Sequence, residues 1–221
     1  ILMGKIVGKG GEIHSYEPYL PSFNILEKNI KLNDLPNIVN CYNYAVSDKT
    51  GTKKLYIGEA DNVHTLLDFR GNEAQDDFIL IKTLDINQIL EKIGKRIDFL
   101  RMDIEGYERH IFNRLSEFDR SLLPTRIFFE IHPIGEIDPD PSFNDPLRKV
   151  LKIGYVPELV ISSSNVDALK RFEKLNYHPS SMFYSGKNRI FGFNNIKASD
   201  LLKVAARRPK MVRAILLKRK R

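Results

Sequence analysis

Two acidic residues follow an apolar stretch in the middle of the sequence, where a strand would end. Asp103 and Glu105 come directly after residues 97–102, and Gly106 marks a sharp exit into a helix. In open α/β sheets the carboxyl ends of strands line the crevice in which ligands bind, so these carboxylates are candidates for a binding or catalytic site. A simpler interpretation is that they place negative charge in the positive first turn of the next helix.

A second pair of functional side chains ends the next predicted strand, residues 125–131. Glu130 is its last acid, and His132 follows directly. An imidazole titrates near neutral pH, so His132 is the best candidate for a base, and Glu130 can orient it or bind hydroxyl groups. The alternative is a strand-end histidine that is hydrogen-bonded to a nearby loop.

Two acids nearer the amino terminus also lie at strand ends. Glu17 ends the predicted strand 12–17, and in a dinucleotide-type fold an acid at the end of the second strand accepts hydrogen bonds from the ribose hydroxyls. Asp48 follows the predicted strand 38–46, where a Ser-Asp pair is also common in an ordinary turn.

Predicted strands and helices alternate along the chain and would hold these residues. Strands are expected at 12–17, 38–46, 53–57, 78–83, 97–102, 125–131 and 155–161, followed by a hairpin of 182–184 and 189–193. Helices are expected at 1–8, 21–32, 85–94, 107–118, 146–153 and 164–176. This alternation predicts a doubly wound, mostly parallel sheet with an antiparallel terminal hairpin.

Composition fits one globular domain in a chain of 221 residues, of which 42% are hydrophobic and 29% are charged. No apolar run approaches the roughly 20 residues that span a bilayer. The single cysteine, Cys41, is expected to be a buried thiol in a reducing compartment, so we expect a cytoplasmic protein.

Basic residues are concentrated at the carboxyl end. The net charge of the chain is +7, and residues 203–221 contain nine Lys or Arg and no acid, so the rest of the chain is near neutral. A nucleic-acid-binding surface on the folded domain is therefore not indicated. We therefore expect a domain at 1–197 and a basic tail at 198–221. With its interleaved apolar residues the tail can lie on an anionic membrane surface, making the protein peripheral to the membrane, or it can be a solvated terminus.

Six short motifs, in order, resemble the FkbM family of S-adenosylmethionine-dependent methyltransferases. They are EIHSYEPY (12–19), NIKLN (29–33), YAVSDKTG (44–51), KTLD (82–85), IDFLRMDIEGYE (97–108) and FFEIHP (128–133). The resemblance is close over residues 1–133 and loose beyond them. It implies a Rossmann-like class I methyltransferase fold. Such enzymes begin with a strand and a glycine-rich loop that this sequence does not contain, so we expect an amino-terminally truncated domain that is marginally stable and binds the cofactor poorly by itself.

The resemblance also implies roles for the strand-end residues. Glu17 would bind the ribose of S-adenosylmethionine, and the predicted exit formed by Ala45, Val46 and Asp48 would border its adenine. Asp103 would lie nearest the methyl group, with both a cofactor-binding and a catalytic role.

For catalysis, the resemblance implies that His132, Glu130 and Asp103 serve O-methylation of a sugar, a glycan or a small natural product. Asp103 and Glu130 can also hold Mg²⁺. The alternative is a truncated or degenerate paralogue that binds no cofactor and acts as an interaction module through its basic tail.

Overall fold

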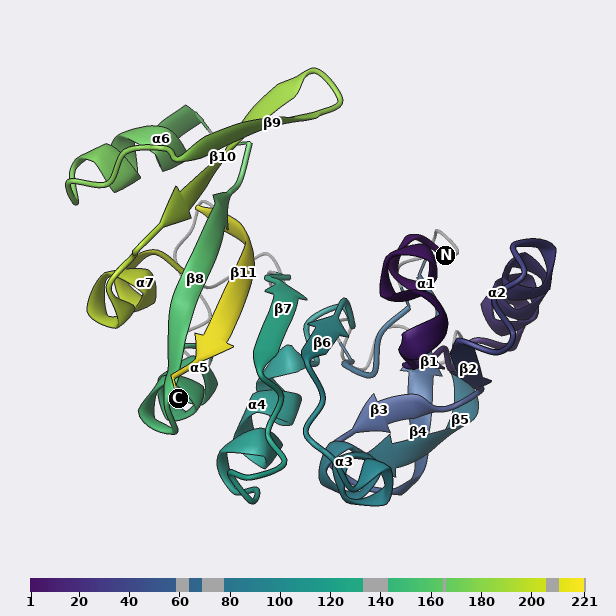
Figure 1. Cartoon of the computed structure of the whole chain (residues 1–221). Helices are drawn as coiled ribbons and strands as arrows, with labels where there is room; N and C mark the ends of the chain where they lie inside the picture. Colours follow the sequence, from purple (N-terminus) through teal and green to yellow (C-terminus); the bar gives the residue numbers. More distant parts are fainter. Residues whose placement is uncertain (59–63, 69–77, 133–142, 165, 206–210, 221) are drawn as a thin grey trace. The chain divides into compact units, whose positions relative to one another are not determined.

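The computed structural model describes residues 1–58, 64–68, 78–132, 143–164, 166–205 and 211–220 (Figure 1). They form two compact units, unit 1 at Ile1–Ile86 and unit 2 at Asn87–Arg221. Each unit has its own sheets and helices, and each is described here by itself.

Unit 1 contains two small sheets. Its elements are α1 (Leu2–Val7), a 3₁₀ turn (Gly8–Gly10), β1 (Ile13–Tyr16), α2 (Leu20–Leu32), β2 (Val39–Tyr42), β3 (Ala45–Ser47), β4 (Gly51–Tyr56) and β5 (Phe78–Asp85). β1 pairs in parallel with β2, and β5 lies between β3 and β4. The first sheet packs on Ile30 and Leu35, whereas the second buries Leu55 and Ile81.

Unit 2 is built around one six-stranded sheet in the order β6-β7-β11-β8-β10-β9. Its strands are β6 (Phe99–Met102), β7 (Arg126–Glu130), β8 (Tyr155–Ser162), β9 (Ser181–Ser185), β10 (Asn188–Asn194) and β11 (Val212–Arg219). Its helices are α3 (Ile86–Ile93), which begins at the boundary between the units, α4 (Glu108–Ser116), α5 (Asn144–Lys152), α6 (Val166–Glu173) and α7 (Ala198–Ala205).

Four strands of this sheet run in the same direction. β6 and β7 are parallel, and β11 is antiparallel to both β7 and β8, so β8 has the direction of β7. β10 is antiparallel to both β8 and β9, so β9 has this direction too. The carboxyl ends of β6, β7 and β8 therefore lie at one edge of the sheet. This edge carries Asp103 and His132, as expected for strand-end residues.

Helix α4 packs against the sheet through an aromatic core. Its residues Ile111, Phe112 and Leu115 are fully buried at the spacing that an amphipathic helix requires. The ring of Phe112 meets the ring of Phe129 on β7 edge to face, with 4.7 Å between their centroids. This packing fixes the start of α4 relative to the end of β7, which sets the geometry of the candidate site.

The sheets differ from the predicted architecture. The chain is a mixed α/β protein, but the described strands form three sheets, and only β1–β2, β3–β5 and β6–β7 pair in parallel. The prediction of one mostly parallel sheet is therefore wrong for these strands. The expected strand 38–46 is also interrupted, because β2 and β3 belong to different sheets. The predicted hairpin is confirmed as β9 and β10, although it isn't the last element.

The described residues of the segment expected as a basic tail are folded instead. Residues 198–205 form α7, and β11 lies inside the sheet between β7 and β8 (Figure 1). Val212, Ile215 and Leu217 are buried there, since a strand with two neighbours and covered faces needs apolar side chains. These apolar residues serve the core, and the boundary at 197 doesn't separate a domain from a tail.

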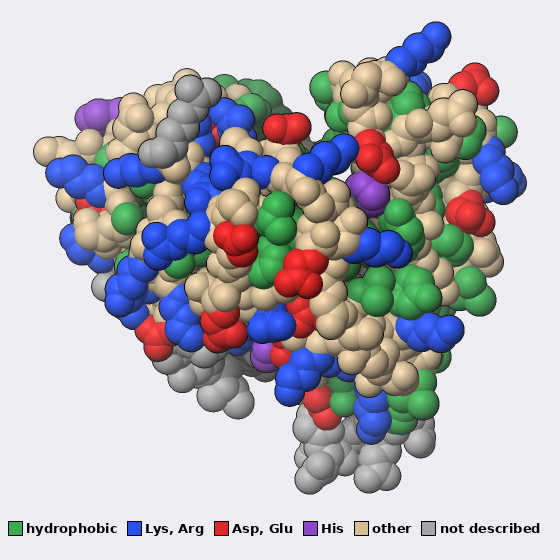
Figure 2. All heavy atoms as spheres, turned by 60° about the horizontal axis from the view of Figure 1, so that its bottom comes forward, with side chains coloured by type: hydrophobic (Ala, Val, Ile, Leu, Met, Phe, Trp, Pro, Cys, Tyr) green, Lys and Arg blue, Asp and Glu red, His purple; other side chains and the backbone are tan. Residues whose placement is uncertain are grey.

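Charged residues on the molecular surface are mixed in sign. On the face shown in Figure 2, Lys and Arg side chains are interspersed with Asp and Glu. Within the part of the chain that the structure describes, no helix has the length and apolar character needed to cross a membrane.

Candidate active site at the ends of β6 and β7

The loop after β6 has an unusual backbone. Glu105 has a φ of 50° and Gly106 a φ of 93°, in the region that favours glycine and that other residues seldom adopt. Asp103 and Glu105 thus extend from a sharp turn between β6 and α4. Such a backbone is compatible with a functional role, because strained residues tend to occur at binding sites.

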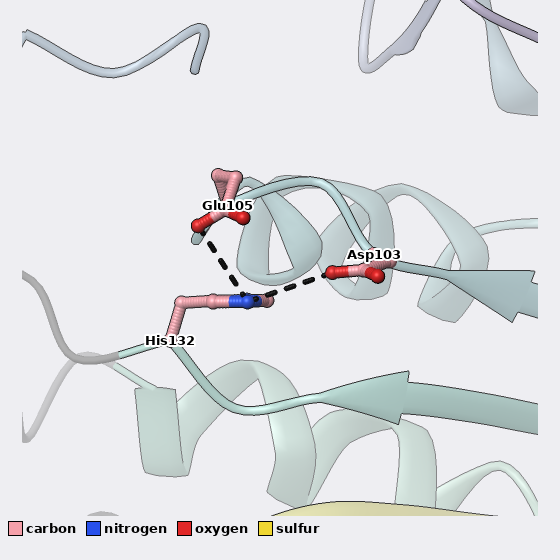
Figure 3. Close-up of side chains that lie close together, drawn as sticks. All are labelled: Asp103, Glu105 and His132. Atoms are coloured by element: carbon pink, nitrogen blue, oxygen red, sulfur yellow. Dashed lines mark ion pairs between the residues drawn. The ribbon is translucent and has the colours of Figure 1, made fainter. Parts of the chain in front are cut away.

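His132 brings the ends of the two strands together. In the parallel register Met102 lies opposite Phe129, so the residues after both strands are neighbours. The Nε2 atom of His132 lies 3.5 Å from Oδ1 of Asp103 and 3.6 Å from Oε2 of Glu105. Figure 3 shows the imidazole ring facing both carboxylates. Asp103, Glu105 and His132 therefore lie close together, and we call these three residues the Asp103 cluster.

A buried carboxylate lies on the other side of the imidazole. Oε1 of Glu108 is 3.3 Å from Nδ1 of His132 and also accepts a hydrogen bond of 3.1 Å from the backbone N–H of Ile104. Glu108 is only 1% exposed. Buried acids are rare unless they are paired, so this residue ties the loop after β6 to the histidine after β7.

Two arginines engage the acids at the strand ends. Nη2 of Arg101 donates to Oδ2 of Asp103 at 2.9 Å, which leaves Oδ1 directed at His132. Oε2 of Glu130 lies 3.8 Å from Nε of Arg213 on β11. Glu130 was expected to orient His132 or to bind hydroxyl groups. In the structure Glu108 is the acid next to Nδ1 of His132, while the side chain of Glu130 pairs with the neighbouring strand.

The electrostatics of the Asp103 cluster favour positive charge. Burial raises the pKa of the Glu105 carboxyl, His132 opposes that rise, and the nearby acids Asp103, Glu108 and Glu130 add to it. One ligand atom from each member of the cluster lies within 4.8 Å of the others. The group can therefore bind a cation, or it can accept a proton from a reacting hydroxyl.

Glu17 occupies the expected strand end in unit 1. It follows β1, and its Oε1 accepts a 2.8 Å hydrogen bond from the backbone N–H of Tyr19. Asn43 donates to the carbonyl oxygen of Glu17, which fixes the turn. Burial raises the pKa of the Glu17 carboxyl, and the hydrogen bond from Tyr19 and the charge of His64 lower it. A half-buried carboxylate of this kind can accept hydrogen bonds from hydroxyl groups.

The other predicted cofactor residues lie in and after β3. Ala45 is buried, Val46 is half-buried, and both belong to a strand rather than to an exit loop. Asp48 follows them, and its Oδ1 lies 2.6 Å from Nζ of Lys53 and 3.0 Å from Oγ of Ser47. Asp48 therefore has a structural partner within unit 1. Binding of the cofactor by Ala45, Val46 and Asp48 of unit 1, together with Asp103 of unit 2, stays a prediction.

The sequence made Glu105 a candidate together with Asp103 but indicated no specific role for it, and it did not single out Glu108. For Glu108 a signal existed, since it lies three and four residues before the buried Ile111 and Phe112. A charged residue within an apolar helix stripe is a sign of a buried polar contact.

Comparisons with known proteins identify the family. The model of the methyltransferase FkbM domain matches residues 2–177. Comparisons with curated proteins and with solved structures give no match. The family match covers both the strand-end acids of unit 1 and the whole Asp103 cluster, and the chain therefore belongs to the FkbM methyltransferase family.

Proposed function

We propose that this protein is an S-adenosylmethionine-dependent O-methyltransferase that acts on a hydroxyl group of a sugar, a glycan or another small molecule. The observation that carries the proposal is the Asp103 cluster, in which an imidazole faces two carboxylates at the carboxyl ends of parallel strands. The family match supports methyl transfer as the reaction class.

The residues of unit 1 fit the cofactor's polar groups. S-adenosylmethionine supplies an electrophilic methyl group on a sulfonium. The half-buried carboxylate of Glu17 suits the ribose hydroxyls because a carboxylate only accepts hydrogen bonds. The backbone next to Ala45 and Val46, with Asp48 after it, is proposed to border the adenine.

The Asp103 cluster is proposed to hold the acceptor. Methyl transfer requires the acceptor oxygen to be aligned with the methyl carbon, and holding the reactants in this geometry lowers the barrier. The oxygen forms a bond to carbon, the carbon–sulfur bond breaks with its electron pair passing to sulfur, and the hydroxyl proton leaves. His132 is within reach of that proton if the hydroxyl binds against Asp103 and Glu105.

Formation of S-adenosylhomocysteine tests this function in the protein with its complete natural sequence. With a panel of hydroxylated acceptors we expect turnover by the wild type. Asp103→Ala and His132→Ala should reduce kcat more than they weaken cofactor binding, because their contacts are made in the transition state. A folded protein that forms no S-adenosylhomocysteine and binds no cofactor would support the interaction-module alternative.

A further inference from the structure

We propose that Asp103, Glu105 and His132 form a site for a divalent transition-metal ion, with Mn²⁺ or Zn²⁺ favoured over Mg²⁺. Asp103 would provide Oδ1, Glu105 would provide Oε2 and His132 would provide Nε2. This ligand set differs from the pair Asp103 and Glu130 that the sequence suggested. The ion site follows from the geometry of unit 2, and only its role in methyl transfer rests on the proposed function.

The first argument concerns hydrogen-bonding capacity. Nδ1 of His132 lies 3.3 Å from a carboxylate oxygen of the buried Glu108, and an ionised carboxylate can only accept, so this contact favours the tautomer with hydrogen on Nδ1. In that neutral tautomer Nε2 has a lone pair and no hydrogen to donate. Nε2 lies 3.5 and 3.6 Å from two further carboxylate oxygens, so a cation bound between these atoms would offset their repulsion.

The second argument concerns distance. Two ligand atoms bound at a tetrahedral angle to an ion about 2.1 Å away are about 3.4 Å apart. The Nε2–Oδ1 and Nε2–Oε2 distances of 3.5 and 3.6 Å have this spacing. All three ligand atoms lie within 4.8 Å of one another, so an ion can bind between them once the side chains shift to bring the two carboxylate oxygens to the same spacing.

The third argument concerns the residues behind the ligands. Metal-binding histidines usually donate their second N–H to a carboxylate, and Glu108, at 1% exposure, occupies that position. Arg101 holds the second oxygen of Asp103 and so directs the first toward the centre. Both contacts fix the orientation of a ligand before an ion arrives.

The donor set indicates the kind of ion. One imidazole nitrogen with two carboxylate oxygens suits Mn²⁺ and Zn²⁺, whereas Mg²⁺ prefers oxygen ligands alone. Three protein ligands also leave coordination positions for water or an acceptor hydroxyl. An ion at this site would lower the pKa of a bound acceptor hydroxyl, and the hydroxyl proton would pass to water. With the ion bound, His132 would act as a ligand and not as the base.

Titration of the full-length protein with MnCl₂, followed by the electron paramagnetic resonance signal of free Mn²⁺, tests the site. We expect one bound ion per chain and weaker binding of Mg²⁺. Asp103→Asn, Glu105→Gln and His132→Gln should each weaken Mn²⁺ binding at least about tenfold, and Glu108→Gln should weaken it by about 10- to 100-fold. Circular dichroism of each variant confirms that the fold is kept.

Two further variants separate this site from general attraction by acids. Glu117→Gln changes an exposed carboxylate on the same connection and should bind Mn²⁺ as the wild type does. Glu130→Gln removes a nearby charge that is not a ligand, so it should weaken binding less than Asp103→Asn does. Since the side chain of Asp103 is at the surface, Asp103→Asn keeps the test valid if a more buried variant fails to fold.

The ion site is overturned if the wild type binds neither Mn²⁺ nor Zn²⁺ saturably, or if Asp103→Asn and Glu105→Gln bind them normally. Calorimetric titration of the same preparations with S-adenosylmethionine keeps the two proposals apart. Ion binding without cofactor binding would refute only the proposed function, and cofactor binding without ion binding would refute only the ion site.

Discussion

At the scale of single residues, Glu108 links the backbone of the loop after β6 to His132. Replacing it with alanine leaves the N–H of Ile104 without its acceptor in a partly buried place. We expect Glu108→Ala to lower the free energy of unfolding by about 1–3 kcal/mol, measured by urea denaturation. The exposed Glu117→Ala should change it by less than about 0.5 kcal/mol, and equal effects of the two changes would contradict the assigned role of Glu108.

Glu17 should make stability depend on pH. Burial raises its pKa above the ordinary value of 4.5, so the folded state holds the proton more tightly than the unfolded state. Proton binding by Glu17 therefore adds to the free energy of unfolding. This addition is fully present below pH 4.5 and is lost as the pH rises through the raised pKa. Relative to the wild type, Glu17→Gln should gain stability as the pH rises through this window. Thermal unfolding at several pH values checks this, and a change in the opposite direction would mean that the carboxylate is stabilised by the fold.

At the scale of elements, β11 holds unit 2 together because it pairs with both β7 and β8. Ile215 is fully buried in this strand, whereas Lys218 is exposed. We expect Ile215→Ala to lower the free energy of unfolding by about 2–5 kcal/mol and Lys218→Ala to have little effect. Denaturant unfolding measures both. Similar small effects would mean that residues 212–219 are a peripheral tail after all.

β11 could not be predicted from the sequence, whereas helix α3 could. Periodic apolar positions predicted α3 well, since Ile86, Ile89 and Leu90 form the buried stripe of an amphipathic helix. β11 has a continuous apolar run flanked by basic residues, and this pattern also fits a membrane-surface segment. Only its pairing with strands far away in the sequence makes it a central strand, and such long-range pairing is not visible in local patterns.

At the scale of the whole molecule, strand-end residues from distant segments make one site in unit 2. The positions of Asp103 and His132 followed from the rule that adjacent parallel strands end at the same edge. Glu108 did not follow from it, because an acid in the first turn of a helix normally faces solvent. The roles assigned to Glu17 and Asp48 depend on the cofactor and stay predictions.

Calorimetric titration of the full-length protein with S-adenosylmethionine tests the central claim most directly. The account predicts one cofactor per chain, binding weakened at least about tenfold in Glu17→Ala, and nearly normal binding in His132→Ala. Glu12→Ala, which changes a more exposed acid at the other end of β1, serves as the matched control and should bind normally. A folded wild-type protein that does not bind the cofactor, or a Glu17→Ala variant that binds it normally, would contradict the account.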